Sequence, residues 1–163
     1  MTRSEIVVVS GVGDDATELG AFDAALADAG LHNYNLVTLS SVIPPGTTVV
    51  TRDRFARDAD LAVGDAVAVV LASATTAEGG SVAAGLGWAT SPEGGVFFEV
   101  TGETEQACRD AVAASLDGAR ARRDWNWQDG AVRTAVHRSD RPAAAVVVGV
   151  YGSIDVDSLP VSG

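Results

Sequence analysis

The sequence predicts an α+β protein in which antiparallel sheets are covered on their outer faces by helices. Short apolar runs rich in β-branched residues are separated by turn residues, and only two longer segments carry apolar residues at helical spacing. Hydrophobic residues make up 47% of the 163-residue chain, enough for a sizeable core. This length suits one domain spanning residues 1–163. We therefore expect two helices packed over sheets.

The first third of the chain supplies a strand, a helix and a second strand. Glu5–Gly11 is a β-branched run that we expect to end in a glycine-rich turn. Thr17–Ala29 has apolar residues at helical spacing, and Gly30 stands where a helix ends. Leu36–Ile43 reads as one strand, stopped by the Pro-Pro-Gly at 44–46.

The middle of the chain predicts a polar loop, a hairpin of two strands and one further strand. Thr51–Asp60 is polar and indicates a loop or a poor helix. Asp65–Ala74 and Ser81–Thr90 flank Glu78–Gly80, a pattern typical of a hairpin. Gly94–Gly102 is a further strand.

The last third predicts the second helix and a second hairpin. Glu103–Arg123 has the helical pattern, and Ala131–His137 and Ala143–Tyr151 flank a turn around Arg138–Pro142. Ile154–Gly163 is rich in turn residues, and we expect poor order there. The total is seven strands and two helices.

The residue types exclude several kinds of enzyme. All 11 basic residues are arginine, so no lysine is present for a pyridoxal-phosphate Schiff base, a Walker phosphate loop or an aldolase. One cysteine and two histidines do not make the usual zinc sets or a disulfide framework, and we expect no metal. Chemistry on this chain needs another source of electrophilicity.

The net charge of −11 argues against nucleic acid as a partner. The arginines at Arg120, Arg122 and Arg123 read as a helix end among acids. An acidic surface without lysine also suits a high-salt interior. No stretch reaches the ~18 apolar residues of a membrane span. The apolar run at the start of the chain is too short for a signal peptide. The lone Cys108 fits a reducing compartment. We expect a cytoplasmic protein without membrane contact.

One weak motif and the two histidines favour ordinary structural roles. Gly11-Val-Gly-Asp-Asp-Ala16 matches half of a dinucleotide fingerprint, but the next strand lacks the acidic residue for a ribose, so a plain turn is favoured. The G-x-S-x-G signature of hydrolases is absent. We therefore interpret His32 and His137 as surface or capping histidines rather than general bases.

The segment Asn33–Gly46, NYNLVTLSSVIPPG, is the hardest to explain as plain structure. Ser40 and Ser41 lie inside an otherwise apolar strand beside a rigid Pro-Pro-Gly corner. The two hydroxyls could simply satisfy nearby backbone groups. They could also flank a cleavable peptide bond.

Three blocks of sequence resemble the pyruvoyl-dependent arginine decarboxylases. They are LGAFDAALADAG at Leu19–Gly30, the Asn33–Gly46 segment, and GGVFFEV at Gly94–Val100. They match that family in order and spacing. The resemblance implies a four-layer αββα sandwich, with mainly antiparallel sheets, that forms a homotrimer with active sites between neighbouring protomers.

The resemblance also implies that the chain makes its own cofactor. The Ser41 hydroxyl would attack the Ser40 carbonyl, and β-elimination and hydrolysis would convert residue 41 into a covalent pyruvoyl group with loss of ammonia. The chain would be cut between 40 and 41 into a short and a long piece. The ketone would then bind the α-amine of arginine and accept the electrons released with carbon dioxide, giving agmatine.

Three further residues carry over from the family. Glu99 would be the proton donor, desolvated by its apolar neighbours, and Asn35 would position the Ser40 carbonyl and the substrate. Asp23 would bind the guanidinium across a subunit interface. The plainer readings are an outward-facing glutamate, a turn asparagine and a solvent-facing aspartate.

Two alternatives stay open at this point. The family tends to carry a small residue where His32 stands, so the same chemistry could act on another basic or aromatic amino acid. A catalytically silent trimeric binding protein could also keep this fold.

Overall fold

The structure, a computed structural model, describes residues 5–56 and 60–155. Within these residues it has nine strands and two helices. In chain order they are β1 (Glu5–Asp14), α1 (Glu18–Ala29), β2 (Asn35–Thr38), β3 (Val42–Ile43), β4 (Thr48–Thr51), β5 (Ala66–Thr76), β6 (Gly80–Ser91), β7 (Gly94–Gly102), α2 (Glu105–Arg122), β8 (Ala131–Ser139) and β9 (Ala143–Ile154).

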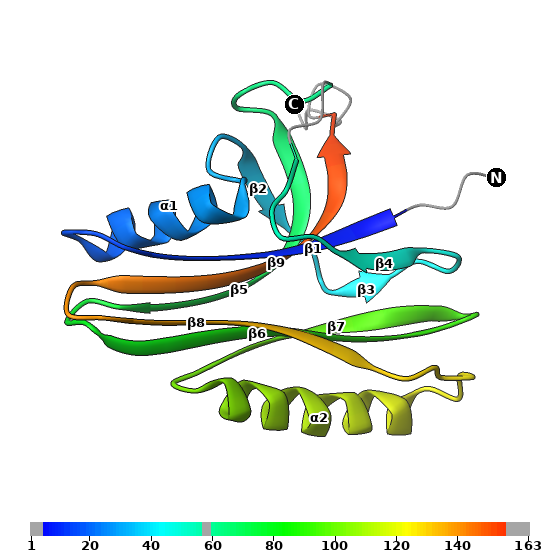
Figure 1. The fold of residues 1–163 in the computed structure, drawn as a ribbon. Coiled ribbons are helices and arrows are strands. Elements are labelled where there is room, and N and C mark those ends of the chain that lie inside the picture. The colour runs from blue at the N-terminus through cyan, green and yellow to red at the C-terminus, as the bar shows by residue number, and fades with distance from the viewer. Residues whose placement is uncertain (1–4, 57–59, 156–163) are drawn as a thin grey trace, which may run out of the picture.

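The strands form two sheets. The first has the order β2-β5-β9-β1-β4 and the second the order β3-β7-β6-β8. Most neighbours are antiparallel, but β1 pairs with β4, and β2 with β5, in parallel. Figure 1 shows the sheets lying face to face, with α1 along the first sheet and α2 along the second. The predicted α+β class, with mainly antiparallel sheets, is confirmed.

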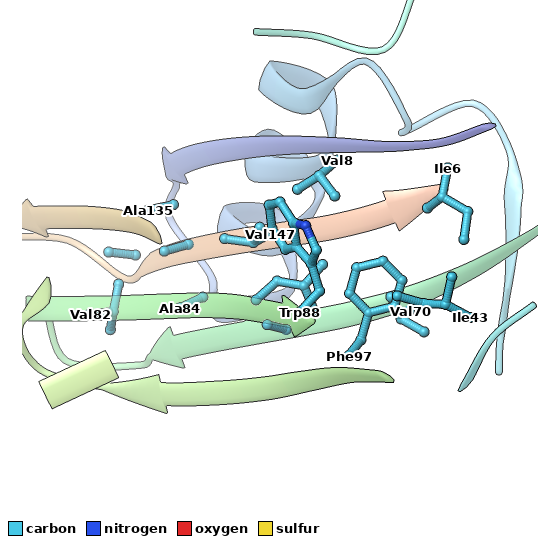
Figure 2. Close-up of a cluster of buried hydrophobic side chains, with 14 residues drawn as sticks. Ile6, Val8, Ile43, Val70, Val82, Ala84, Trp88, Phe97, Ala135 and Val147 are labelled. Carbon is cyan, nitrogen blue, oxygen red and sulfur yellow. The ribbon is translucent and has the colours of Figure 1, made fainter. Parts of the chain in front are cut away.

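Three clusters of buried side chains hold these elements together. The cluster between the sheets includes Trp88 and Phe97, whose ring centroids lie 6.0 Å apart. Figure 2 shows both rings lying between strands of the two sheets. A second cluster joins α1 to the first sheet, and a third joins α2 to the second sheet. Burial of one large apolar side chain stabilises the fold by about 1.5–3 kcal/mol, so Phe97, at 2% exposure, is a main contributor.

Both predicted helices are confirmed, and their ends follow local rules. The Thr17 hydroxyl accepts a hydrogen bond from the Gly20 N–H at 3.0 Å, and Gly30 ends α1 with φ of +83°. The Thr104 hydroxyl caps α2 by accepting from the Ala107 N–H at 3.1 Å. Each side-chain cap satisfies a donor that the helix itself leaves unpaired.

The expected glycine turn after the first strand is wrong. β1 continues to Asp14, so Gly11 and Gly13 lie inside the strand. A Cβ atom on Gly11 would lie 2.1 Å from the Ala25 carbonyl oxygen, and one on Gly13 would lie 2.6 Å from the Ala24 Cβ. The two glycines therefore let α1 approach the sheet closely, which is neither a turn nor a nucleotide-binding role.

Both expected hairpins are also wrong. β5 and β6 belong to different sheets, and so do β8 and β9. In each pair the chain turns from one sheet to the other, so the strands meet through side chains rather than through backbone hydrogen bonds. The turn residues mark the reversal correctly, but they do not determine whether the two strands pair edge to edge or pack face to face.

The predicted strand Leu36–Ile43 is two strands. β2 lies at the edge of the first sheet and β3 at the edge of the second, with Leu39–Ser41 crossing between them. The stretch 51–60, expected to be a loop or a poor helix, begins with the last residue of an unpredicted strand, β4, while 57–59 lie outside the described residues. The expectation for 154–163 falls mostly outside them too, and Ile154 ends β9.

Candidate active site

The Ser40-Ser41 pair lies where the chain leaves one sheet for the other. The Leu39 N–H donates to the Val69 carbonyl of β5 at 2.8 Å, which is the backbone contact with the first sheet just before the crossing. Two residues later the Ser41 carbonyl accepts from the Phe97 N–H of β7, also at 2.8 Å. Backbone bonds to different sheets therefore hold both ends of this short crossing.

Ser41 has an unusual backbone conformation. Its φ is +69°, and no other non-glycine residue in the described ranges has a positive φ. The left-handed region costs an L-residue roughly 1–2 kcal/mol, because its Cβ crowds the following carbonyl oxygen. Such a conformation persists only where surrounding contacts hold it, and it occurs preferentially at functional sites.

The Ser41 hydroxyl donates a hydrogen bond to Oε1 of Glu99 on β7. The structure thus brings together two of the predicted site residues that lie 58 positions apart in the sequence. A carboxylate in this position can accept the hydroxyl proton and so activate the oxygen as a nucleophile. Ser40 itself makes no hydrogen bond within the described part of the chain.

Glu99 is more accessible than its neighbours in the sequence suggest. Along β7, Phe98 and Val100 face the cluster under α2, whereas Phe97 and Glu99 point toward the first sheet. The Glu99 side chain is exposed. The expectation that flanking apolar residues bury it is wrong for the single chain, because strand alternation turns two of those three residues to the opposite face.

Tyr151 is a site residue that sequence reasoning missed. Its hydroxyl donates to the Val42 carbonyl at 2.7 Å, and its ring centroid lies 6.1 Å from that of Phe97. Burial, with a smaller contribution from the Glu99 carboxylate, raises the pKa of Tyr151 to about 12. The signal in the sequence was a tyrosine, an aromatic residue with a polar hydroxyl, at the end of the apolar run of β9.

Asn35 does not reach Ser40 within one chain. Its side-chain amide donates to the Gly64 carbonyl at 2.7 Å, and its backbone N–H donates to the Asp65 carbonyl at 2.9 Å. Ser40 follows five residues later, beyond a strand that rises about 3.3 Å per residue. Asn35 therefore holds the loop before β5 in this chain.

Asp23 is likewise separate from Ser41 and Glu99. It is exposed on α1, which packs on the outer face of the first sheet, whereas Ser41 and Glu99 meet at the second sheet. His32 is also exposed, just after the end of α1. The structure thus brings together Ser41 and Glu99, while Asn35 and Asp23 lie elsewhere on the protomer.

His137 is neither a capping nor a simple surface residue. Its Nε2 lies 2.8 Å from Oδ2 of Asp14 on β1, so the pair joins the two sheets. Nearby on β8, Arg133 makes a similar connection by donating to the Ser10 hydroxyl at 3.0 Å. These contacts explain His137 as a structural residue.

Three further features bear on the candidate site. Residues 5–56 and 60–155 contain no cluster of three or more metal-ligating side chains. No helix in that part of the chain is long and apolar enough to cross a membrane. A cavity of about 770 Å³ lies around Thr76 and Arg138, and neither Ser41 nor Glu99 lines it.

Comparison with known proteins identifies the family. The family model described as pyruvoyl-dependent arginine decarboxylase matches residues 5–155. The chain is 42% identical over 159 residues to the pyruvoyl-dependent arginine decarboxylase of Halobacterium salinarum, covering 95% of this chain and 97% of that protein. It is 44% identical over 68 residues to pyruvoyl-dependent arginine decarboxylase 2 of Archaeoglobus fulgidus, covering 42% of each chain. On this evidence the chain belongs to the pyruvoyl-dependent arginine decarboxylase family.

Proposed function

We propose that this chain cleaves itself and then converts L-arginine into agmatine and carbon dioxide. One observation carries the proposal: in a member of this family, Ser41 is held in the left-handed region with its hydroxyl bonded to Glu99. The nucleophile required for self-cleavage is thus next to a group that can take its proton.

Cleavage begins when the Ser41 oxygen attacks the Ser40 carbonyl carbon. The C–O bond forms, the C–N bond between residues 40 and 41 breaks, and the hydroxyl proton passes by way of Glu99 to the freed amine. Loss of the Ser41 α-proton then expels the Ser40 carboxylate and leaves dehydroalanine. Water replaces the nitrogen, ammonia leaves, and a pyruvoyl group remains at residue 41. The products are residues 1–40 and 41–163.

The residues present fit the cofactor that the family implies. Serine carries the three carbons that a pyruvoyl group keeps and a β-oxygen that can leave with the Ser40 carboxylate, and the Phe97 N–H donates to the carbonyl of residue 41. When formed, the group supplies a ketone that accepts electrons as carbon dioxide leaves. We assign Glu99 to deliver the proton to the α-carbon of the product.

Substrate binding calls for more than one protomer. Asn35 and Asp23 do not reach Ser41 in one chain, so we propose that a neighbouring protomer supplies them, Asp23 to the guanidinium and Asn35 near the Ser40 carbonyl. A carboxylate suits a guanidinium because it accepts two parallel hydrogen bonds. Val37, Leu39 and Val42, all beside the serine pair, are 41%, 40% and 56% exposed. Exposed apolar side chains at this position support a subunit interface.

We propose a homotrimer of single-domain protomers with a four-layer αββα arrangement. The three buried clusters, one between the sheets and one beneath each helix, support the four layers within a protomer. We also propose a cytoplasmic location with high salt, supported by the net charge of −11 and by Cys108, which is buried and unpaired.

A denaturing gel and the intact mass of purified protein test self-cleavage. We expect two pieces cut between 40 and 41, with the longer one lighter than it would be with an N-terminal serine. The Ser41→Ala variant should remain whole, whereas Ser115→Ala, a matched change on α2, should cut normally. A wild-type chain that stays whole after prolonged incubation contradicts the proposal.

Release of carbon dioxide from a panel of amino acids tests the substrate. Arginine should be preferred, and Asp23→Ala should raise its KM by roughly 10-fold to 100-fold, because a hydrogen bond to a charged group contributes about 1.5–3 kcal/mol. Asp117→Ala, an exposed carboxylate on α2, serves as the control. An unchanged KM in Asp23→Ala would remove Asp23 from the arginine site.

A further inference from the structure

The polar groups of Ser41 and Val42 are held by three different neighbours. Glu99 accepts from the Ser41 hydroxyl, the Phe97 N–H donates to the Ser41 carbonyl, and the Tyr151 hydroxyl donates to the Val42 carbonyl. Two of these neighbours lie on β7. Tyr151 comes from β9, in the opposite sheet.

The position of Tyr151 depends on an irregularity in the sheet. In the pairing of β9 with β5, Val150 lies opposite Val69 and Gly152 lies opposite Ala68. Tyr151 is therefore an extra residue without a partner on β5, as in a β-bulge. Bulges redirect a side chain and are frequent next to active sites. Here the redirected side chain crosses the gap between the sheets to reach β3.

The Tyr151 hydroxyl is suited to act as a permanent donor. The ring packs against Phe97, which is itself buried, so the direction of the hydroxyl is set by the core. Burial and the Glu99 carboxylate raise the pKa of this phenol to about 12. It therefore keeps its proton, and its hydrogen bond to Val42, at any pH near neutral.

The backbone of Ser41 shows what this bond does. With a positive φ, Ser41 tends to relax toward an extended conformation, which would swing the hydroxyl away from Glu99. Rotation of that kind also turns the Ser41–Val42 peptide. The hydrogen bond from Tyr151 to the Val42 carbonyl opposes this rotation one residue after Ser41. The hydrogen bond from the Phe97 N–H to the Ser41 carbonyl opposes it at Ser41 itself.

We propose that Tyr151 is a positioning residue for self-cleavage: through the Val42 carbonyl it keeps Ser41 in the left-handed conformation in which its hydroxyl meets Glu99. The inference rests on the proposed function. It concerns the rate of scission, which is measured on the uncut chain before any decarboxylation.

The first test follows scission in freshly synthesised full-length chain by a timed denaturing gel. Tyr151→Phe keeps the ring and removes only the hydroxyl, and it should slow scission roughly threefold to tenfold, the effect of one neutral hydrogen bond. Tyr34→Phe, which removes the hydroxyl of the other tyrosine, should cut at the wild-type rate. Thermal unfolding of both variants reports whether the fold is intact.

A second pair of variants separates hydrogen bonding from packing. Para-aminophenylalanine at 151 retains a donor, whereas para-methylphenylalanine has similar size and none. We expect the amino variant to recover most of the wild-type rate and the methyl variant to remain slow, even if Tyr151→Phe folds poorly. Equal rates for this pair, or a Tyr151→Phe chain that cuts like wild type, overturn the proposal. A wild-type chain that does not cut refutes self-cleavage instead.

Discussion

Ser41 combines a strained backbone with a hydrogen-bonded hydroxyl. Left-handed serine costs roughly 1–2 kcal/mol, whereas a neutral hydrogen bond contributes about 0.5–1.5 kcal/mol and one to a charged group about 1.5–3 kcal/mol. The three bonds around Ser41 and Val42 are therefore sufficient to offset the strain. These contacts hold Ser41 in a left-handed conformation that an isolated strand would not adopt.

The charge of Glu99 should be measurable at Tyr151. In a Tyr34→Phe background, the phenol of Tyr151 can be titrated alone by its ultraviolet absorbance. Because the Glu99 carboxylate disfavours the phenolate, Glu99→Gln should lower the pKa of Tyr151 from about 12 toward its ordinary value. An unchanged midpoint in Glu99→Gln would mean that the carboxylate does not act on the phenol.

The same shift has a consequence for stability. A phenol whose pKa is raised on folding stabilises the native state fully below its ordinary pKa of about 10. That contribution is lost as the pH rises toward 12. Urea unfolding of wild type and Tyr151→Phe between pH 9 and about 11 should show a steeper loss in the wild type.

Cys108 should be chemically silent in the folded protein. It lies on the buried face of α2, and burial raises the pKa of its thiol, so little reactive thiolate is present. A thiol reagent at mild alkaline pH should label it only after denaturation. Rapid labelling of native protein would show that α2 opens locally.

The close packing of each helix on its sheet depends on glycines, which have no side chain. Gly11 and Gly13 let α1 lie against β1, and Gly87 accepts the Val112 side chain of α2, where a Cβ would lie 2.1 Å from Cγ1. Interiors packed this tightly tolerate added methyl groups poorly. The position of each helix therefore depends on its close fit against glycines in the strands as well as on the apolar surface that it buries.

Two glycine-to-alanine changes should have opposite effects on stability. Gly11→Ala should destabilise the fold by about 1–3 kcal/mol, because the added methyl meets the Ala25 backbone. Gly118→Ala, inside α2 and near only the flexible end of Arg122, should stabilise it by about 0.5–1 kcal/mol. Urea unfolding of both variants checks this, and a Gly11→Ala chain as stable as wild type would contradict the close approach.

At the scale of the whole molecule, the predicted site is divided over the surface. Ser41 and Glu99 lie at one place, and Asp23 and Asn35 lie at others, beside exposed apolar residues. Under the proposed function, a second chain completes the binding site for arginine. Assembly and activity should therefore be lost together.

Light scattering tests the assembly. Wild type should have three times the 16.6 kDa chain mass. Leu39→Glu should give smaller species, because it places charge in the proposed interface. Val136→Glu changes a residue of similar exposure, 43% against 40%, on β8 at the opposite edge of the second sheet, and it should leave the mass unchanged. A monomeric wild type refutes the trimer.

The charge of the whole chain predicts a response to salt. With a net charge of −11, repulsion among carboxylates opposes the compact state until counterions screen it. The melting temperature should rise as potassium chloride is added. A melting temperature independent of salt would remove the high-salt proposal.

Local patterns in the sequence predict both helices and most of the strands, and the family resemblance predicts the site candidates. Helix spacing and the glycine at 30 predict α1 almost to the residue, since each signal acts within a few positions. The family resemblance pointed to Ser41 and Glu99, and the structure brings them into contact.

The pairing of the strands and the surroundings of Ser41 depend on contacts between residues far apart in the sequence. Turn residues between β5 and β6 show that the chain reverses, but burial far along the chain decides that the two strands enter different sheets. The same long-range packing splits 36–43 at Ser40 and brings Tyr151 to Val42 from more than a hundred residues away. Local patterns carry no information on such contacts, because they depend on which apolar faces cover one another.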